Sequence, residues 1–130
     1  MILSTTLSMA AAAAIINLWL SMRIGQMRHA KKIIHGDGGD DALIRRMRAQ
    51  LNFVENAPLV LILVAAVELS GRGGAWLGPV AAVFMLGRVA HGIGMDSPTP
   101  NLPRGIGAMT AMLAQLGLAV VCVLIALGKL

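Results

Sequence analysis

The residues best suited to chemistry form a polar stripe at the start of a long apolar segment. This part of the chain reads Arg45-Arg46-Met47-Arg48-Ala49-Gln50-Leu51-Asn52-Phe53-Val54-Glu55. At the helical turn of about 100° per residue, a wedge of roughly 80° holds four of its polar side chains, Arg45, Arg48, Asn52 and Glu55. Arg48 and Glu55 are then separated by about 10 Å along the helix. One face therefore carries cations, an amide and a carboxylate, while Gln50 points elsewhere.

A second polar group is predicted on a later helix, and arginines lie at the ends of the other two. Arg88, His91 and Met95 share one helical face because they are spaced i, i+3 and i+7. Arg104 begins the last apolar segment, and Arg28 follows the first. With helices that alternate in direction, all four bring polar groups to the same depth.

Several guanidiniums, a carboxylate, amides and an imidazole suit a zwitterionic ligand that has more than one carboxylate. Guanidiniums bind carboxylates through paired hydrogen bonds, and Glu55 is suited to an ammonium group. Arg104 would lie at a helix N-terminus, where free N–H groups and the helix dipole attract negative charge. A thiol at this position would shift toward its nucleophilic thiolate. A small thiol-containing peptide fits this set of residues.

A structural role for these residues is the alternative. Charged side chains in a bundle can form interhelical salt bridges, such as one between Glu55 and Arg88, or contact lipid headgroups. We expect Asn17 to make a helix–helix hydrogen bond and Glu68 to lie at the outer rim. A role in membrane topology is expected for the basic residues Lys31, Lys32, Arg45 and Arg46.

Composition restricts the class of protein. Of 130 residues, 57% are apolar and 13% charged, and the mean hydropathy is +0.77. Soluble domains have roughly 45–50% apolar and about 25% charged residues, so these values indicate a membrane protein and exclude intrinsic disorder. The net charge of +5 is accompanied by only 3% aromatic residues, which argues against nucleic-acid binding. The single cysteine, Cys122, excludes an internal disulfide and CxxC metal sites, and no metal site is expected.

Four segments are long and apolar enough to cross a bilayer, which takes about 20 residues. They are Ile2–Met22, Leu51–Leu69, Trp76–Met95 and Gly105–Leu127. The first lacks the positive charge that precedes the core of a signal peptide, so we expect it to be retained. The sequence thus predicts a single all-α domain over residues 1–130, an integral membrane four-helix bundle.

The loops indicate orientation. Most of the Lys and Arg lie between the first two spans, which places this segment in the cytoplasm and both termini on the other side. Asp40 or Asp41 is suited to cap the second helix, which we expect to begin near Ala42. The proline-rich segment Ser97–Pro103 predicts a stiff loop that ends at the start of the last helix.

Three motifs of the chain carry a resemblance: residues 48–55 with Pro58, residues 25–28 with Lys31-Lys32, and residues 83–91. They resemble the MAPEG family, the membrane-associated proteins in eicosanoid and glutathione metabolism. Residues 48–55 followed by Pro58 are similar to its second-helix pattern R-x-Q-x-N-x-x-E with a following proline. The other two matches are Gly25-Gln26-Met27-Arg28 with Lys31-Lys32, and Val83-Phe84-Met85-Leu86-Gly87-Arg88-Val89-Ala90-His91. Arg104 falls where the prostaglandin E synthase branch has its thiol-contacting arginine. The resemblance extends over nearly the whole chain.

The resemblance implies a homotrimer that binds glutathione as co-substrate between neighbouring subunits, near the cytoplasmic side. By similarity, Arg104 of the adjacent subunit would stabilise the thiolate, and a lipophilic small molecule would approach from the membrane lipids. The glutathione-binding residues would be Arg28, Arg48, Asn52, Glu55, Arg88 and His91. The excess of Arg over Lys and the many Ala and Gly favour a bacterial member, hence one in the inner membrane.

The chain also departs from the eicosanoid enzymes. It has no tyrosine, and it carries Asn56 and Met95 where several of them have one. Gly105 replaces a serine that follows the catalytic arginine in the prostaglandin branch, so synthesis of prostaglandins or leukotrienes is not expected. The function predicted first is a glutathione-dependent transferase or peroxidase, with a non-catalytic glutathione- or lipid-binding protein as the alternative. A small multidrug transporter is disfavoured because the first span holds Asn17 and no glutamate.

Overall fold

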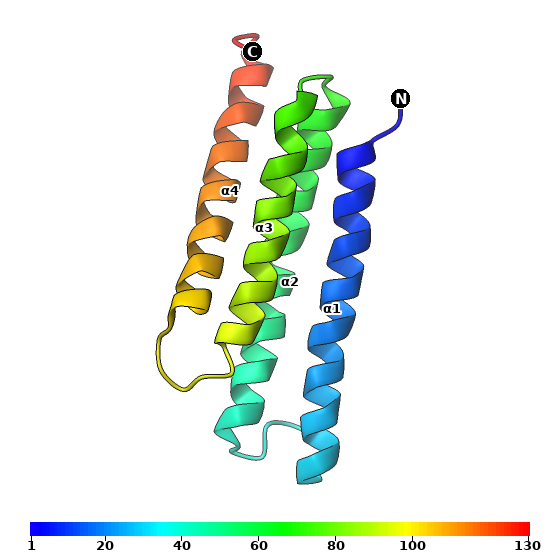
Figure 1. Ribbon diagram of the computed structural model, residues 1–130. Coiled ribbons are helices and arrows are strands. Elements are labelled where there is room, and N and C mark those ends of the chain that lie inside the picture. The colour runs from blue at the N-terminus through cyan, green and yellow to red at the C-terminus, as the bar shows by residue number, and fades with distance from the viewer.

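The computed structural model describes residues 1–130 and contains four α-helices and no strands. The helices are α1 (Ser4–Lys31), α2 (Asp41–Leu69), α3 (Gly74–Gly94) and α4 (Leu102–Ala126). Each is long and apolar enough to cross a membrane, so the predicted all-α bundle of four membrane-spanning helices is confirmed. Both termini lie at one end of the bundle, and the α1–α2 and α3–α4 loops lie at the other (Figure 1).

The first two helices are longer than their predicted spans. α2 has 29 residues, which corresponds to about 43 Å, whereas the hydrocarbon core of a bilayer is about 30 Å thick. α1, with 28 residues, likewise continues past Met22 to Lys31. The extra turns carry most of the basic residues and lie at the loop end of the bundle. We call this end the basic end, and the end that holds the termini the outer end.

Capping residues set where α2 and α4 begin. Asp40 caps α2, since its Oδ1 accepts a 2.8 Å hydrogen bond from the amide of Leu43. Lys31 also donates to the Asp40 carboxylate, and this bond, followed by the one from Leu43, holds the pKa of Asp40 below its ordinary value of 3.8. Asn101 caps α4 by accepting from the amide of Arg104 at 3.1 Å. Both helix starts agree with the sequence prediction.

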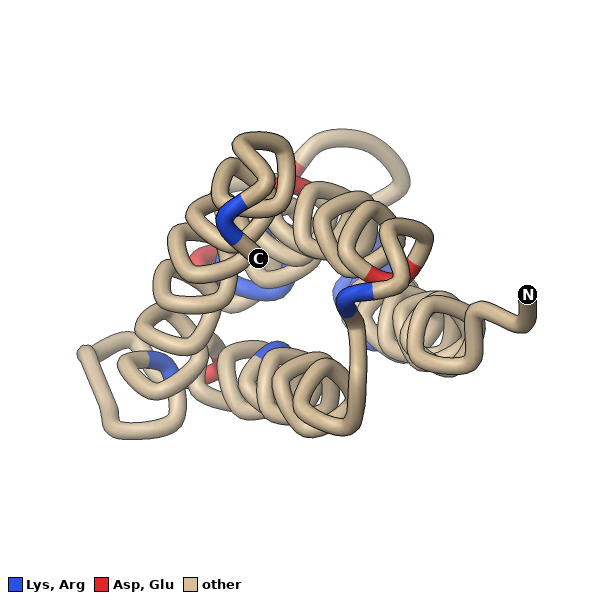
Figure 2. The backbone as a smooth tube through the Cα atoms, turned by 90° about the horizontal axis from the view of Figure 1, so that it is seen from above, with Lys and Arg blue, Asp and Glu red and all other residues tan.

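The α2–α3 pair forms the centre of the bundle. α1 packs on one side of this pair and α4 on the other, and α1 and α4 do not contact each other. Figure 2 shows the four helices from the outer end. Fully buried side chains at successive turns of α2 (Val60, Val64 and Val67) pack with Leu77 and Phe84 of α3. The periphery carries exposed Leu and Ile side chains on every helix, as expected for a surface in contact with lipid or another apolar partner.

Glycines bring α3 and α4 unusually close. A Cβ atom added to Gly107 would lie 2.4 Å from the Cβ of His91 and 2.6 Å from the carbonyl oxygen of Gly87. A Cβ added to Gly87 would lie 2.0 Å from Oγ1 of Thr110. Small residues at such positions allow helix backbones to approach closely in a membrane bundle. This contact determines which face of α3 is covered by α4.

Glu68 connects the outer ends of α1 and α2. It lies at the end of α2, where a rim residue is expected, and its carboxylate accepts hydrogen bonds from the amides of Thr5 at 2.9 Å and Thr6 at 2.8 Å. The hydroxyl of Thr6 adds a third bond at 2.7 Å. These are among the N–H groups that have no partner within α1, so Glu68 acts as a helix cap supplied by a neighbouring helix.

A polar contact also joins α1 and α2 nearer the basic end. Nε2 of Gln50 donates to Oγ of Ser21 at 2.6 Å and to Oδ1 of Asn17 at 3.4 Å. The expected helix–helix hydrogen bond of Asn17 is therefore confirmed. Gln50 points toward α1 and contacts a different neighbour from Asn52, which bonds to Arg88 of α3.

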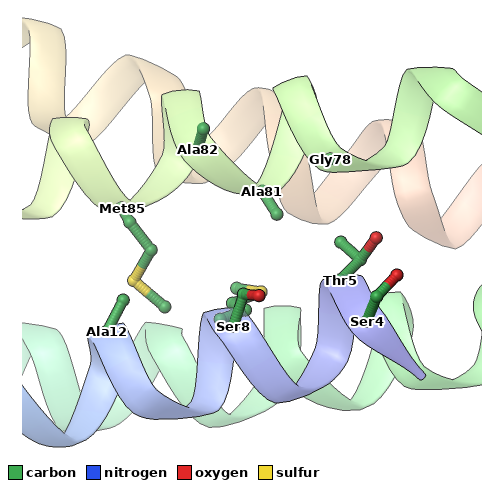
Figure 3. A pocket seen from close by; sticks show the side chains of 9 residues that line it. Ser4, Thr5, Ser8, Ala12, Gly78, Ala81, Ala82 and Met85 are labelled. Atoms are coloured by element: carbon green, nitrogen blue, oxygen red, sulfur yellow. The ribbon is translucent and has the colours of Figure 1, made fainter. Parts of the chain in front are cut away.

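A pocket of about 390 Å³ lies between α1 and α3 in the outer half of the bundle. Figure 3 shows Ser4, Thr5 and Ser8 of α1 on one side of it and Ala81 and Met85 of α3 on the other. No charged residue lines this pocket. The charged residues singled out by the sequence lie outside this pocket, toward the basic end.

Candidate functional site

The stripe on α2 presents two charged side chains on an open face. Arg48 and Glu55 are exposed, and Asn52 between them is half-buried. Neither Arg48 nor Glu55 takes part in any of the three salt bridges of the chain. The salt bridge considered between Glu55 and Arg88 is therefore not present. Glu55 is the fifteenth of the 29 residues of α2, which places a carboxylate close to the middle of a membrane-spanning helix.

Arg88 lies behind this face, in contact with three helices. Its side chain is only 2% exposed, and Nη1 donates a 2.6 Å hydrogen bond to Oδ1 of Asn52. Nη2 donates to the carbonyl oxygen of Gly107 on α4. The guanidinium carbon also lies 5.5 Å from the centre of the Phe84 ring. Arg88 thus holds Asn52 in place, and its Nε is a buried donor that no acceptor satisfies.

His91 is covered by α4. It is 6% exposed, and the closely approaching Gly107 packs against its Cβ. In this arrangement Arg88 lies behind Asn52 and His91 lies against α4, so both are buried and neither is exposed on the face of Arg48 and Glu55. Direct binding of glutathione by either residue stays a prediction. Helical periodicity had placed the two correctly on one face of α3, but it could not show that α4 covers that face.

Arg28 and Arg48 meet in a groove between α1 and α2. The groove has a volume of about 730 Å³, within the range of roughly 300–1,000 Å³ that is common for small-molecule sites. Asp37 of the α1–α2 loop lines it as well, together with apolar side chains that include Ile24 and Leu51. Arg28 is fixed there because its Nη1 donates to the carbonyl oxygen of Gly36 at 2.6 Å.

Arg104 lies in the first turn of α4, as predicted. Its amide is bonded to the capping side chain of Asn101, while its guanidinium is half-buried and makes no hydrogen bond within the chain. The first turn of α4 packs against the end of α3, since a Cβ added to Gly94 would lie 2.5 Å from the amide nitrogen of Arg104. Its cationic group is thus free to act on a ligand or a neighbouring chain at the basic end.

A further cluster at this end was missed from the sequence. Asp96, just after α3, accepts hydrogen bonds from Arg23 of α1 and from Nε of Arg46 of α2 at 3.3 Å. The partners are 73 and 50 residues away from Asp96 along the chain, so local periodicity carries no sign of them. One signal was present: Asp96 is the only acidic residue after Glu68, and it falls at the end where arginines gather.

The arrangement combines fixed donors with unpaired charges. Arg28 and Asn52 are held by contacts within the chain, whereas Arg48, Glu55 and Arg104 have side-chain charges that no residue of the chain neutralises. This combination suits a ligand with both carboxylate and ammonium groups. No cluster of three or more His, Cys, Asp or Glu side chains that could hold a metal ion is present.

The comparison with known families agrees with the motifs. The model of the MAPEG family matches residues 6–124, which include most of all four helices and every candidate residue named above. A search of curated proteins found no match to the chain. Because the family match extends over nearly the entire sequence, this four-helix membrane protein belongs to the MAPEG family.

Proposed function

We propose that the protein is a membrane-embedded, glutathione-dependent transferase or peroxidase that acts on lipophilic electrophiles. The observation that carries the proposal is the open face of α2, where exposed Arg48 and Glu55 flank the Asn52 that Arg88 holds. Unpaired charges are expensive in a membrane-spanning helix and mark functional sites. A zwitterionic tripeptide supplies the complementary charges: its carboxylates fit Arg28 and Arg48, and its ammonium group fits Glu55.

Arg104 is the residue proposed to act on the thiol. Its unpaired guanidinium and the N-terminus of α4 both favour an anion, and the thiolate is the nucleophilic form of a thiol. The thiolate attacks the electrophilic atom of an apolar substrate that enters from the bilayer, and the leaving group departs with the electron pair. For a hydroperoxide, the thiolate attacks the terminal oxygen and breaks the O–O bond, which releases the alkoxide, protonated to the alcohol, and leaves the sulfenic acid of glutathione. The thiol of a second glutathione then attacks this sulfur, displaces water and forms the disulfide.

A second copy of the chain is part of the proposal. Glu55 and Arg48 are exposed on one face of α2, and exposed Leu51 and Val54 accompany them, so this face suits burial against another subunit. A homotrimer in which glutathione lies between neighbouring subunits, with Arg104 supplied by the adjacent one, is the assembly we propose. A bacterial inner membrane, with the basic end in the cytoplasm, is the proposed location.

The proposal is tested by ultraviolet absorbance of the glutathione thiolate on the purified protein in detergent. The wild type is compared with Arg104→Ala and with Arg72→Ala, which removes an exposed arginine at the outer end. We expect a thiolate signal that Arg104→Ala abolishes and Arg72→Ala preserves. Glutathione binding without thiolate in the wild type would instead indicate a non-catalytic binding protein, which the absence of tyrosine favours. If the wild type does not bind glutathione, both the enzyme proposal and the glutathione-binding alternative are contradicted.

A further inference from the structure

The loop between α3 and α4 is attached to the other two helices through one acidic residue. The Asp96 carboxylate accepts hydrogen bonds from Arg23 of α1 and from Arg46 of α2. Its main-chain carbonyl oxygen accepts a third from Nε of Arg45 at 3.2 Å. No other carboxylate lies in α3, α4 or their loop, so nothing else in the second half of the chain can take this position.

The arginines that converge on Asp96 are themselves fixed. The guanidinium of Arg23 lies over the Trp19 ring, 4.8 Å from its centre, and Nη1 donates to the carbonyl oxygen of Gly92 at 3.0 Å. Nη1 of Arg46 donates to the carbonyl oxygen of Arg23 at 2.9 Å. Asp96 is therefore held at a defined place relative to α1, α2 and the end of α3.

The opposite end of the loop places Arg104. Nδ2 of Asn101 donates to the carbonyl oxygen of Gly94 at 2.7 Å, while Oδ1 of the same side chain accepts from the amide of Arg104. Between Asp96 and Arg104 the chain contains three prolines, whose rings restrict φ and stiffen the connection. The segment 96–104 is short and stiff, and it is held at Asp96 by the arginines and near Arg104 by Asn101. The position of Asp96 therefore influences the position of the first turn of α4.

We propose that Asp96 is a positioning residue for Arg104, because it fixes the α3–α4 loop to α1 and α2 and so sets where α4 begins. This inference rests on the proposed function, in which Arg104 stabilises the glutathione thiolate. Electrostatic stabilisation requires a donor held at the place where charge develops, and a displacement of about 1 Å can cost roughly 100-fold in rate. Without the Asp96 carboxylate, two guanidiniums lose their counter-charge, and of the three arginine contacts to Asp96 only the one from Arg45 to its main-chain carbonyl keeps its acceptor.

The test compares Asp96→Asn with Asp41→Asn, a matched loss of an exposed carboxylate that makes no side-chain hydrogen bond at the same end of the bundle. Hydrogen exchange measured by mass spectrometry follows the amides of Arg104 and Gly105, both of which bond to Asn101. We expect these amides to exchange about tenfold faster in Asp96→Asn and at the wild-type rate in Asp41→Asn. Unchanged exchange in Asp96→Asn would overturn the proposal.

A second measurement separates positioning from general damage. Thiolate absorbance of bound glutathione is recorded across pH, together with the glutathione dissociation constant. We expect Asp96→Asn to reduce the thiolate about tenfold at neutral pH with less than about threefold change in the dissociation constant, and Asp96→Glu to restore much of it. A loss of thiolate that is matched by an equal loss of glutathione affinity, or that Asp96→Glu does not restore, would indicate general damage and overturn the proposal.

The two measurements also distinguish this inference from the proposed function. If the wild type forms no thiolate, the proposed function fails, and faster exchange at Arg104 in Asp96→Asn still supports the placement of α4 by Asp96. If the thiolate forms and both readouts are unchanged in Asp96→Asn, the proposed function stands and the role assigned to Asp96 is wrong. Circular dichroism of each variant establishes that the four helices are retained.

Discussion

Arg88 of α3 and Asn52 of α2 are joined by a 2.6 Å hydrogen bond in which Nη1 donates to Oδ1. Because this oxygen is occupied, the amide nitrogen of Asn52 is the part of the side chain left to face a ligand. An amide nitrogen is a donor, which suits a carboxylate or a peptide carbonyl. The buried arginine therefore determines which chemical group Asn52 presents on the open face.

Arg88→Lys tests this relationship. A lysine ammonium lacks the planar fork that reaches Asn52 and Gly107 at once, so the Asn52 amide loses its fixed orientation. We expect the affinity for glutathione to fall about tenfold, or about 1.4 kcal/mol, measured by titration calorimetry in detergent. Arg72→Lys at the outer end serves as the control. Wild-type affinity in Arg88→Lys would show that Asn52 does not depend on Arg88.

Glu55→Gln tests whether the exposed carboxylate of α2 binds an ammonium group. Glutamine keeps the shape and removes the charge, so glutathione should bind about tenfold more weakly, a loss typical of a charge-assisted hydrogen bond. A glutathione analogue that lacks the α-amino group should bind the wild type and the variant equally. The four dissociation constants, for two ligands on two proteins, are measured in the same detergent. An equal loss for both ligands would contradict the assignment of Glu55 to the ammonium group.

The fold was predictable because it follows from local patterns. The apolar segments between Ile2 and Leu127 are long enough to span a bilayer, and capping residues such as Asp40 mark where helices begin. Periodicity also grouped Arg48 with Glu55, and Arg88 with His91, on common faces. Each of these inferences depends on residues within a few turns of one another.

The burial of Arg88 and His91 was not predictable from the same patterns. Periodicity shows which side chains share a face, but the helix that covers that face depends on the close approach of Gly107 and Gly87. The hydrogen bonds of Asp96 and Glu68 likewise join residues that are at least 50 positions apart in the sequence. Such contacts depend on how the helices are arranged, and a single sequence does not contain that information.

Gly107→Ala tests the contact between α3 and α4. The added methyl group would lie 2.4 Å from the Cβ of His91, so the two backbones must move apart. Overpacking of this kind costs about 1–3 kcal/mol, which should lower the thermal unfolding midpoint followed by circular dichroism. Gly117→Ala on the same helix meets no atom within 4 Å and serves as the matched control. Equal midpoints for the two variants would contradict close packing at Gly107.

Asp40 makes stability depend on pH. Its pKa in the folded protein lies below the ordinary value of 3.8, because Lys31 and the Leu43 amide bond to the charged form. The stabilisation is therefore complete above about pH 4 and is lost as the pH falls through the folded-state pKa. The unfolding midpoint should fall more steeply below about pH 4 in the wild type than in Asp40→Asn, in which asparagine still caps α2 but does not titrate. If the unfolding midpoints of the wild type and Asp40→Asn fall in parallel as the pH is lowered, Asp40 does not make stability depend on pH.

The bond between Glu68 and the start of α1 has a consequence for biogenesis. The amides of Thr5 and Thr6 leave the ribosome before their acceptor Glu68, which is synthesised 62 to 63 residues later, at the far end of α2. The first helix can therefore complete its N-terminus only after the second has crossed the membrane in the opposite direction. A nascent chain arrested before Glu68 would hold α1 with these amides unpaired, so the helical hairpin of α1 and α2, rather than either helix alone, is the smallest unit that inserts with its ends satisfied.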